Sequence, residues 1–398
     1  MSGPLTGIKV IEIGTLIAAP FAARLMAEFG AEVIKIEAPG EGDPIRKWRK
    51  LHKGTSLWGY LQSRNKKSIS INLKAPEGIA IVKRLAESAD VLIENMKPGA
   101  LEKLGLGWDV LHALNPKLTM VRISGYGQSG PYKDRPGFGA IGEAMGGIRY
   151  TTGEEGRVPA RVGVSLGDSL ASLHAVMGAL MSVLRVKTGQ GDGQVVDVSL
   201  VESVFNLMES LIPEYDLLGH VRERSGGALP GIAPSNTYPT RDGSYVVIAG
   251  NSNPIYKRLM NVIGRPDLAD DPQFAQNDGR AAQVALIDGA IAGWTSAHSI
   301  EDVLAALERA EVPAGRIYSV KDIVADPHYQ ARDMILQSTL PDGVQVKMPG
   351  IVPKLSDTPG EVRWQGPQLG EHTASVLAEM GMTAGDIERL REQGVVQC

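Results

Sequence analysis

Cysteine is almost absent from this chain: the only one is Cys398, the last of 398 residues. An intrachain disulfide needs two cysteines and a zinc knuckle needs at least two thiolates, so both are excluded. No internal cysteine is present to act as a nucleophile. This usage is typical of the reducing cytoplasm, and we expect a cytoplasmic protein.

Other absences narrow the class of protein. The net charge of −4 and the isoelectric point near 6.0 provide no general basic field for nucleic acid or anionic lipid. The seven histidines form no closely spaced pair, so we expect no metal. The first residues lack a basic stretch followed by an apolar one, and no apolar run approaches the roughly 18 to 20 residues of a membrane span. We expect neither secretion nor a membrane span.

What the chain does contain is an alternation of short β-branched segments with amphipathic helical ones. The predicted strands are residues 9–13, 32–37, 68–72, 90–94 and 118–124, and the predicted helices between them include 19–29 and 76–88. This order predicts an α/β, Rossmann-like domain with a mostly parallel sheet. After the first strand, Gly-Thr-Leu-Ile-Ala-Ala-Pro replaces the Gly-x-Gly-x-x-Gly dinucleotide fingerprint, so no nicotinamide or flavin is expected.

The length predicts two domains at roughly 100 to 200 residues each. A glycine-rich segment at 225–231 leads into a predicted strand pair, 236–240 and 244–249, and then into helices. We therefore predict a large domain over 1–224 that ends with a linker helix at about 200–218. A small inserted α+β domain would cover 225–320, and the chain would return to the large domain over 321–398.

One carboxylate stands at a position suited to chemistry. Asp168 lies where a glycine-containing segment gives way to an apolar run with helical spacing. Such a residue is often an N-cap, because Asp and Ser are common caps. It is also a candidate nucleophile, since the positive end of a helix dipole stabilises negative charge.

Ten blocks of sequence, spread in order along nearly the whole chain, resemble the class III (CaiB/BaiF-type) coenzyme A transferases. They are residues 7–12, 20, 29–37, 40–43, 64–69, 94–100, 105–107, 124–127, 166–168 and 369–373. In that family the aspartate matching Asp168 attacks the donor thioester, which gives a mixed anhydride and then an aspartyl-CoA thioester. The resemblance therefore implies that Asp168 is the nucleophile and that CoA is carried as a substrate, with no prosthetic group.

The resemblance also implies which segments contact CoA, whose phosphates need cations and backbone N–H donors. The residues matching those segments are Ile17, Ala18, Asn72, Leu73, Lys74, Asn95, Met96, Lys97, Lys103 and the stretch 136–139 with Phe138 and Gly139. One departure is Ala38, where the formyl-CoA enzyme carries an arginine. We expect Arg46 to supply part of the missing phosphate contact.

Further departures bear on the substrate. Ile17, Gly139 and residues 250–253 replace the glutamine, glutamate and tetraglycine loop of the formyl-CoA enzyme, so formyl transfer to oxalate is not expected. We expect Glu143, Asn251 and Asn253 to lie near the substrate. Further candidates, for pairing with a distal carboxylate, are Arg135, Arg149 and Arg161. The sequence therefore favours a succinyl-CoA donor and a C4 to C6 dicarboxylate acceptor such as itaconate, mesaconate, malate or citramalate.

Two alternatives stay open. The family includes α-methylacyl-CoA racemases, which carry His-Asp where this chain has Phe138 and Gly139, although Glu143 could still offer an acid–base group. A non-catalytic CoA-binding protein is the other alternative.

The resemblance also implies an interlocked homodimer, in which each chain threads a hole between the domains of the other.

Overall fold

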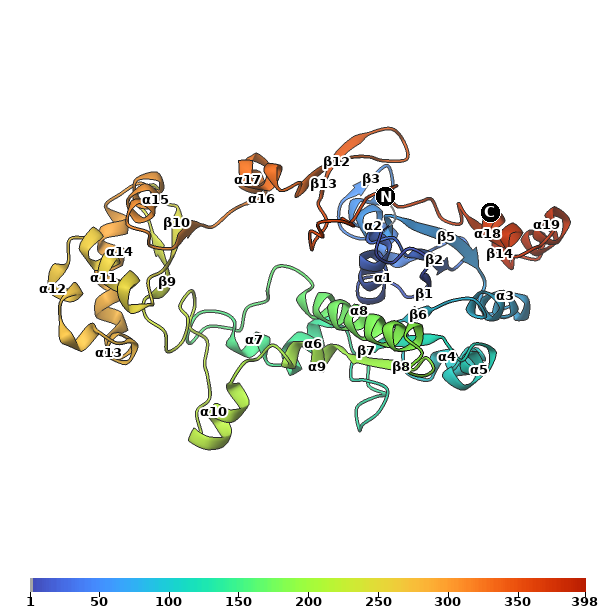
Figure 1. The fold of residues 1–398 in the computed structure, drawn as a ribbon, viewed down its shortest axis with the longest axis horizontal. Coiled ribbons are helices and arrows are strands. Elements are labelled where there is room, and N and C mark those ends of the chain that lie inside the picture. The colour runs from blue at the N-terminus through green and yellow to red at the C-terminus, as the bar shows by residue number, and fades with distance from the viewer. Residues whose placement is uncertain (1–2) are drawn as a thin grey trace. The chain divides into compact units, whose positions relative to one another are not determined.

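The computed structural model describes residues 3–398, which form two compact units (Figure 1). Unit 1 contains the chain up to Ile148, then Val162–Glu209 and Ala331–Cys398, and unit 2 contains Arg149–Arg161 and Ser210–Gln330. These limits differ from the predicted boundaries after residues 224 and 320. Residues 149–161 belong to unit 2 because Gly226 N donates to Gly153 O at 2.9 Å and Arg224 Nη1 donates to Tyr150 O at 2.8 Å. No local pattern reveals such distant pairings.

Unit 1 is built on a seven-stranded sheet, and the predicted parallel α/β arrangement is confirmed. In spatial order the strands are β14 (Val396–Gln397), β5 (Lys66–Ile71), β2 (Glu32–Glu37), β1 (Lys9–Ile13), β6 (Val91–Glu94), β7 (Thr119–Ser124) and β8 (Val195–Ser199). All neighbours pair in parallel except β14, which runs antiparallel to β5. The order reverses beside β1, because the chain moves outward through β2 and β5 and then crosses back to β6.

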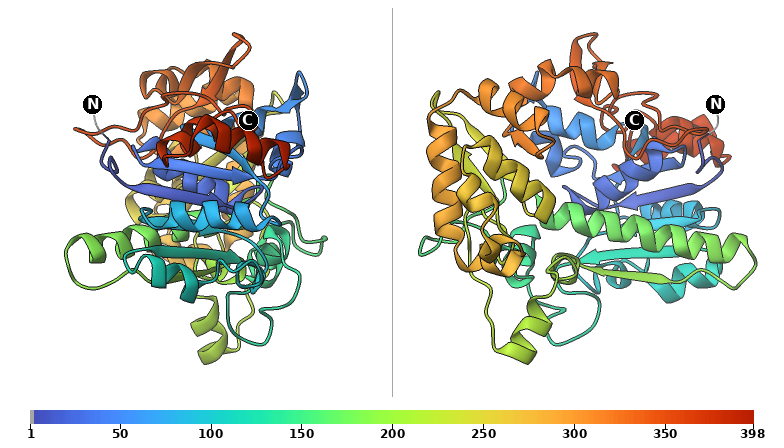
Figure 2. Two further views of the ribbon diagram at one scale, coloured as in Figure 1. Left: turned by 90° about the vertical axis from the view of Figure 1, so that its right-hand side faces the viewer. Right: turned by 60° about the vertical axis from the view of Figure 1, so that its left-hand side comes forward.

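The sheet is apolar on both faces because successive side chains of a strand point to opposite sides. On β6, Val91 and Ile93 face one cluster and Leu92 faces the other. The first cluster is closed by α1 (Ala18–Glu28) and α8 (Leu166–Lys187), and the second by α3 (Pro76–Ala86), α5 (Trp108–Leu114), α18 (Thr373–Glu379) and α19 (Ala384–Glu392). In Figure 2, α8 runs alongside the strands of the sheet.

By length and composition, the 22-residue α8 could cross a membrane, so the prediction that no segment approaches that length is wrong. Its small residues explain its position in the structure. Ala171, Ala175 and Ala179 are fully buried in the cluster on the sheet and bring the helix close to the strands. A core helix of this kind meets the same length and composition test as a membrane span.

Shorter elements complete unit 1. They are η1 (Pro44–Lys47), β3 (Leu51–His52), β4 (Thr55–Ser56), α2 (Leu57–Ser63), α4 (Ala100–Lys103), α6 (Gly139–Met145), α9 (Leu200–Phe205), β12 (Ile335–Thr339) and β13 (Gln345–Pro349). The predicted helix over 200–218 is wrong, because α9 ends at Phe205 and α10 (Leu211–Leu218) begins separately in unit 2. Glu209, between them, has a φ of 50°, which no helix accommodates.

Unit 2 has its own core around a three-stranded antiparallel sheet. The predicted strand pair is confirmed as β9 (Ser235–Pro239) and β10 (Tyr245–Ala249), with β11 (Ala314–Arg316) added at the edge. Besides α10, the helices are α7 (Ile148–Thr151), which spans the boundary with unit 1, α11 (Asn253–Val262), α12 (Pro266–Ala269), α13 (Asn277–Ala282), α14 (Val284–Ser296), α15 (Ile300–Arg309), α16 (Val320–Ala325) and α17 (Pro327–Ala331), with η2 at Pro272–Phe274.

A buried ion cluster lies where β1, β2 and β5 approach one another. Glu12 is fully buried and accepts from Lys35 Nζ at 2.6 Å and from Lys66 Nζ at 2.7 Å. Lys35 also lies 2.8 Å from Asp43 Oδ2. Burial lowers the pKa of Lys66 to about 8, with Glu12 opposing the shift and Lys35 adding to it. Removing one member would leave a buried charge unpaired, which typically costs about 3 to 5 kcal/mol.

A second buried carboxylate, Glu37, ends β2. It accepts from Arg46 through Nε and Nη2, both at 2.7 Å, and from Ser68 Oγ at 2.6 Å. Burial alone would raise the pKa of Glu37, but these hydrogen bonds and the charge of Lys35 lower it to about 2.

This lowered pKa predicts an acid-dependent loss of stability. Glu37 stabilises the fold fully above its ordinary pKa of 4.5, and the contribution is lost as the pH falls toward 2. A Glu37→Gln variant lacks the contribution at every pH. In urea unfolding followed by circular dichroism, the stability gap between the two proteins should shrink by about 2 kcal/mol between pH 6 and pH 3. Equal acid sensitivity of both proteins would contradict this account.

Candidate active site

The reversal of strand order beside β1 places a crevice outside the carboxyl ends of β1, β6 and β7, the usual ligand position in an open α/β sheet. A cavity of about 290 Å³ lies there, here named the nucleophile cavity. Its lining residues are Thr15, Leu16, Ile17, Ala18, Asn95, Met96, Lys97, Pro98, Ile123, Ser124, Gly125, Lys133, Arg135, Pro136, Gly137, Phe138, Asp168 and Leu200. Segments distant in the sequence thus meet at one edge of the sheet.

One wall is the loop between β1 and α1, which is held in an unusual conformation. Leu16 has a φ of 65°, in the left-handed region that a branched side chain rarely adopts. Its N–H donates to Asp43 Oδ1 at 2.9 Å. Thr15 and Asn95 exchange two hydrogen bonds of 2.9 Å, which join this loop to the end of β6. The positions of Ile17 and Ala18 are therefore fixed by Asp43, at the start of η1, and by Asn95, directly after β6.

The loop after β6 is anchored by Glu94, which is 1% exposed. Its Oε2 accepts from Met96 N at 2.7 Å, and its Oε1 accepts from Arg122 Nε at 2.8 Å. Burial raises the pKa of Glu94, although Arg122 opposes the shift. This carboxylate orients Asn95–Lys97 from beneath the cavity and does not itself line it.

Asp168 is the third residue of α8, and Ser165 occupies the N-cap position. The simple cap interpretation of Asp168 is therefore wrong. Its carboxylate stands in the first turn, where the helix dipole stabilises negative charge. The Ser172 hydroxyl contacts Asp168 O and Ala18 O, each at 2.7 Å, and so joins this turn to the start of α1.

Gly139 lies directly against the Asp168 carboxylate. A Cβ at residue 139 would stand 2.0 Å from Asp168 Oδ2, which is impossible without displacing the carboxylate. Glu143, in the same helix α6, is 1% exposed, and its Oε1 accepts a hydrogen bond from Gly167 N at 3.4 Å. Gly139 thus borders Asp168, and Glu143 is buried beside the residue that precedes Asp168.

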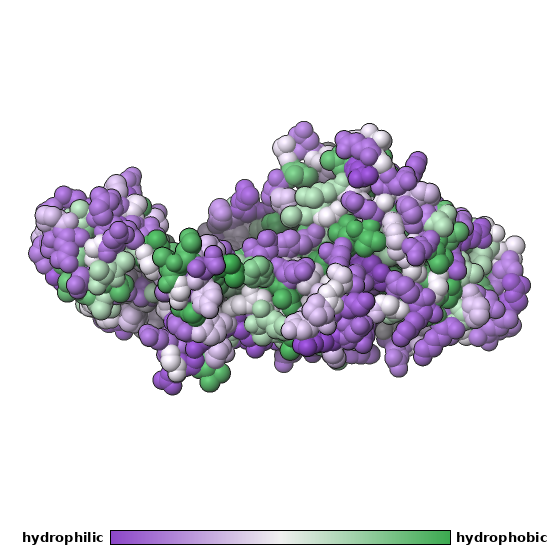
Figure 3. Space-filling model, turned by 90° about the horizontal axis from the view of Figure 1, so that it is seen from below, coloured by the Kyte–Doolittle hydropathy of each residue, from purple (hydrophilic) through white to green (hydrophobic). Residues whose placement is uncertain are grey.

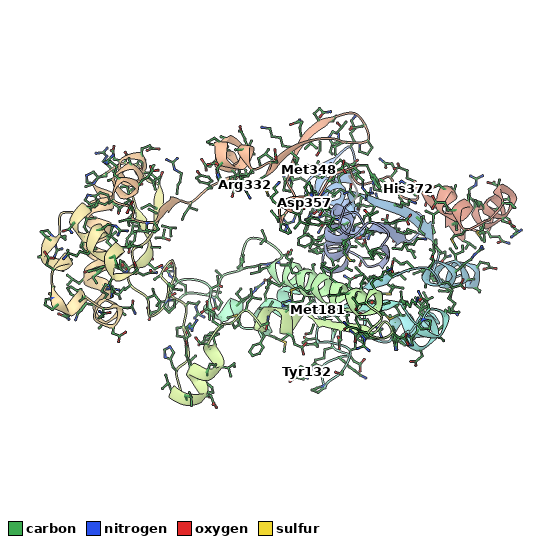
Figure 4. The ribbon with its side chains drawn as sticks, in the orientation of Figure 1. Tyr132, Met181, Arg332, Met348, Asp357 and His372 are labelled. Carbon is green, nitrogen blue, oxygen red and sulfur yellow. The ribbon has the colours of Figure 1, made fainter. Side chains whose placement is uncertain are left out.

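A second cavity, of about 200 Å³, shares Thr15 and Met96 with the nucleophile cavity. It is lined by Asn72, Leu73 and Lys74 after β5, together with the ends of β1 and β2. Exposed cations stand along the two cavities: Lys74, Lys97, Lys133 and Arg135. Arg135 is stacked 3.7 Å over the ring of Tyr132, which Figure 4 labels in the loop before α6. This charge suits a long ligand carrying several phosphates.

Several other predicted residues line neither of these two cavities. Lys103 is exposed at the end of α4 and lines neither cavity. Arg46 already donates to Glu37 through two nitrogens and to Pro367 O through Nη1, so the prediction of a free phosphate-binding guanidinium is wrong. Asn251, Asn253, Arg149 and Arg161 belong to unit 2, where Asn253 Nδ2 donates to Gln276 Oε1 at 2.9 Å and Asn251 O accepts from Arg280.

Sequence reasoning missed Lys133 in the cavity wall and Asp43 as the residue that holds Leu16. Asp43 lies within a block of the family resemblance, residues 40–43, so the sequence did carry a signal. The role of Asp43 depends, however, on its contact with Leu16, 27 residues away in the chain.

A larger cavity of about 580 Å³ lies along residues 333–365 and includes none of the predicted site residues. Within residues 3–398, no cluster of three His, Cys, Asp or Glu side chains could hold a metal ion.

A carboxylate in the first turn of a helix thus lines a cation-rimmed crevice of an α/β fold, an arrangement suited to an anionic ligand. The chain belongs to CoA-transferase family III, whose model matches residues 5–373. The predicted class III resemblance is confirmed.

Named relatives and a solved structure agree with this family. The chain is 50% identical to a succinyl-CoA–D-citramalate CoA-transferase of Chloroflexus aurantiacus over 99% of this chain and 98% of that protein. It is 37% identical to a succinate–glutarate CoA-transferase of Agrobacterium fabrum over 95% of this chain and 96% of that protein. A crystal structure of a CaiB/BaiF family protein from Brucella suis matches with a TM-score of 0.82 and 34% identity, over 96% of this chain and all of that one.

The contact between Gly139 and Asp168 predicts a specific sensitivity. A Gly139→Ala substitution must move the carboxylate, and a displacement of about 1 Å can lower a reaction rate about 100-fold. We expect a loss of CoA transfer of this size, with an unchanged circular dichroism spectrum. Gly163→Ala is the matched control, because a Cβ there meets nothing within 4 Å. Equal activity of the two variants would show that the contact does not constrain Asp168.

Proposed function

We propose that the protein moves CoA from succinyl-CoA to a C4 to C6 dicarboxylate through a covalent intermediate on Asp168. The observation that carries the proposal is the Asp168 carboxylate in the first turn of α8, lining a cation-rimmed cavity and bordered by Gly139. The named relatives support the substrate class, since by name one uses succinyl-CoA with D-citramalate and the other succinate with glutarate. Citramalate was among the acceptors that the sequence favoured.

The reaction divides into balanced acyl transfers. The Asp168 carboxylate attacks the thioester carbonyl, the C–S bond breaks, and CoA thiolate leaves a mixed anhydride on the enzyme. The thiolate then attacks the Asp168 carbonyl carbon, which releases the donor acid as its carboxylate and gives an aspartyl-CoA thioester. The acceptor carboxylate attacks the carbonyl carbon of that thioester, the C–S bond breaks, and CoA thiolate leaves a second mixed anhydride on Asp168. Thiolate attack on the acceptor acyl carbon forms the new acyl-CoA and restores Asp168.

The surroundings of Asp168 suit these steps. The first turn of α8 stabilises the carboxylate that must be regenerated after each turnover. Lys97, Lys133 and Arg135 along the nucleophile cavity would hold the CoA phosphates while the thiol end exchanges partners. The neighbouring cavity beside Asn72–Lys74 would extend the binding site toward the nucleotide.

Replacement of the nucleophile tests the mechanism. With Asp168→Asn, exchange of CoA between succinyl-CoA and a panel of acids should fall to the rate without enzyme, because the amide cannot form the anhydride. Mass spectrometry of the quenched protein should find an acyl or CoA adduct on the peptide containing Asp168 in the unmutated protein alone. Asp109→Asn, in the first turn of the exposed end of α5, is the matched control.

The other functions remain distinguishable in the same assay. Exchange retained at a near-normal rate by Asp168→Asn would remove this residue from the mechanism. CoA binding without any thioester exchange would favour a CoA-binding protein. Exchange of the α-proton of a branched acyl-CoA would favour a racemase, although Gly139 offers no side chain for that chemistry.

We also propose that the protein is a homodimer. The support is a set of large apolar side chains that the chain leaves exposed, visible in part as apolar patches on the polar surface in Figure 3. On α8 they are Leu173, Met177, Met181 and Leu184, and on α10 they are Ile212, Tyr215, Leu217 and Leu218. Figure 4 labels Met181, which is 64% exposed. Apolar helix faces of this extent are typical of surfaces that a partner covers.

Sedimentation measures this directly. We expect a single dimer over micromolar concentrations, because an obligate dimer buries such faces permanently. A Met181→Glu substitution places a charge on the exposed face of α8 and should lower the sedimentation coefficient toward that of a monomer or cause aggregation. A folded monomer of the unmutated protein at equilibrium would refute the proposal.

A further inference from the structure

A further cavity of unit 1, of about 230 Å³, shares Ile17 with the nucleophile cavity and has no assigned role. We name it the arginine pocket. Its lining residues are Ile17, Phe21, Arg24, Arg49, Trp58, Gln62, Val164, Ser165 and Ser169. Ile17 lines both cavities, and Ser165 and Ser169 stand on either side of Asp168 in the first turns of α8. The pocket therefore lies against the same helical turn that carries Asp168.

Among residues 3–398, Glu28 balances the positive charge beside the pocket only in part. Arg24 Nε lies 3.1 Å from Glu28 Oε1, and the fully buried Arg64 lies 2.5 Å from the same oxygen. Two guanidiniums thus share one carboxylate. Arg24 Nε is buried and makes no hydrogen bond within the described residues, although it is close enough to Glu28 for an ion pair. Burial lowers the pKa of Arg24 to about 10, with Glu28 opposing the shift and Arg64 adding to it. A bound anion would relieve this imbalance.

A second cation stands at the exposed rim. Arg49 is held over the Trp58 ring, with its Cζ 4.4 Å from the ring centroid. Its φ of 60° lies in the left-handed region, so the backbone is constrained to keep this turn. The stacked guanidinium keeps its edge available for bidentate hydrogen bonds with a carboxylate.

The remaining walls match the rest of such a substrate. Ile17, Phe21, Trp58 and Val164 provide apolar surface for a short carbon chain. Gln62 is 2% exposed, and its Oε1 has no hydrogen-bond donor within residues 3–398. A buried acceptor without a donor is unfavourable. A hydroxyl group on the substrate would supply the missing hydrogen bond to Gln62 Oε1.

We propose that the arginine pocket is the subsite for the distal carboxylate of the dicarboxylic acid, bound by Arg49 and Arg24, while the reacting carboxyl group lies at Asp168. This inference rests on the proposed function and makes it specific. The same pocket serves donor and acceptor in turn, because the donor acid leaves before the acceptor attacks. A monocarboxylic acid of the same length fills the apolar walls but offers neither guanidinium a carboxylate.

The test compares two four-carbon acids that differ by one carboxylate. Isotope exchange is measured between succinyl-CoA and succinate and between butyryl-CoA and butyrate, with the full-length protein. We expect Arg49→Gln to lower kcat/KM for succinate by about 10- to 100-fold, mainly through KM, as for a lost charge-assisted hydrogen bond. Exchange of butyrate should stay within about twofold or rise, which a merely structural role would not produce.

Two further variants complete the experiment. Arg24→Lys keeps the buried charge beside Glu28 and should lower selectivity for succinate over butyrate in the same direction, even if Arg24→Gln fails to fold. Arg309→Gln, an exposed arginine on α15, is the charge-matched control.

The outcomes separate the two levels of the proposal. Equal loss for both acids, or no loss for either, in Arg49→Gln and Arg24→Lys would overturn the subsite while leaving CoA transfer intact. Absence of exchange with either acid in the unmutated protein would overturn the proposed function and the subsite together.

Discussion

The ion pairs of Glu12 with Lys35 and Lys66 are the interactions on which the site depends. Lys35 comes from β2 and Lys66 from β5, so one carboxylate joins three adjacent strands where water is excluded. Lys35 in turn pairs with Asp43, whose other oxygen accepts from Leu16 N. The strained loop before α1 is therefore maintained by charges inside the sheet. Because these charges are desolvated, losing any partner is costly. The ion pairs therefore hold the loop that positions Ile17 in one conformation.

α8 unites three separate demands in one helix. Its first turn presents Asp168, its buried alanines pack on the sheet, and its opposite face leaves large side chains such as Met181 exposed. These demands explain why this helix is apolar almost all round. The position of Asp168, the proposed nucleophile, is consequently tied to the core of unit 1 through the same helix, and Ser172 joins that helix to α1.

The parallel sheet could be predicted because strand and helix periodicities are local. Asp168 could be predicted because a helix start and a family block coincide at residues 166–168. The phosphate contact predicted for Arg46 was wrong because this arginine binds Glu37, nine residues earlier in the chain. The sequence around an arginine does not show whether a carboxylate already binds it. Arg24 and Arg49 were missed for a related reason. Arg24 appears as an ordinary helix arginine, and its importance comes from sharing Glu28 with Arg64, 40 residues further along the chain.

The close contact at Gly139 couples that position to the conformation of Asp168. Any other amino acid there brings a Cβ that meets the carboxylate in its present position. The glutamate of the formyl-CoA enzyme and the aspartate of the racemases at this position therefore require a carboxylate placed differently from the one in this chain. Side chains set back from Asp168, such as those on α1 and in the turn before β3, can change without that adjustment. Divergence among descendants of this chain should accordingly begin at those side chains and alter which acids are accepted while the underlying chemistry stays the same.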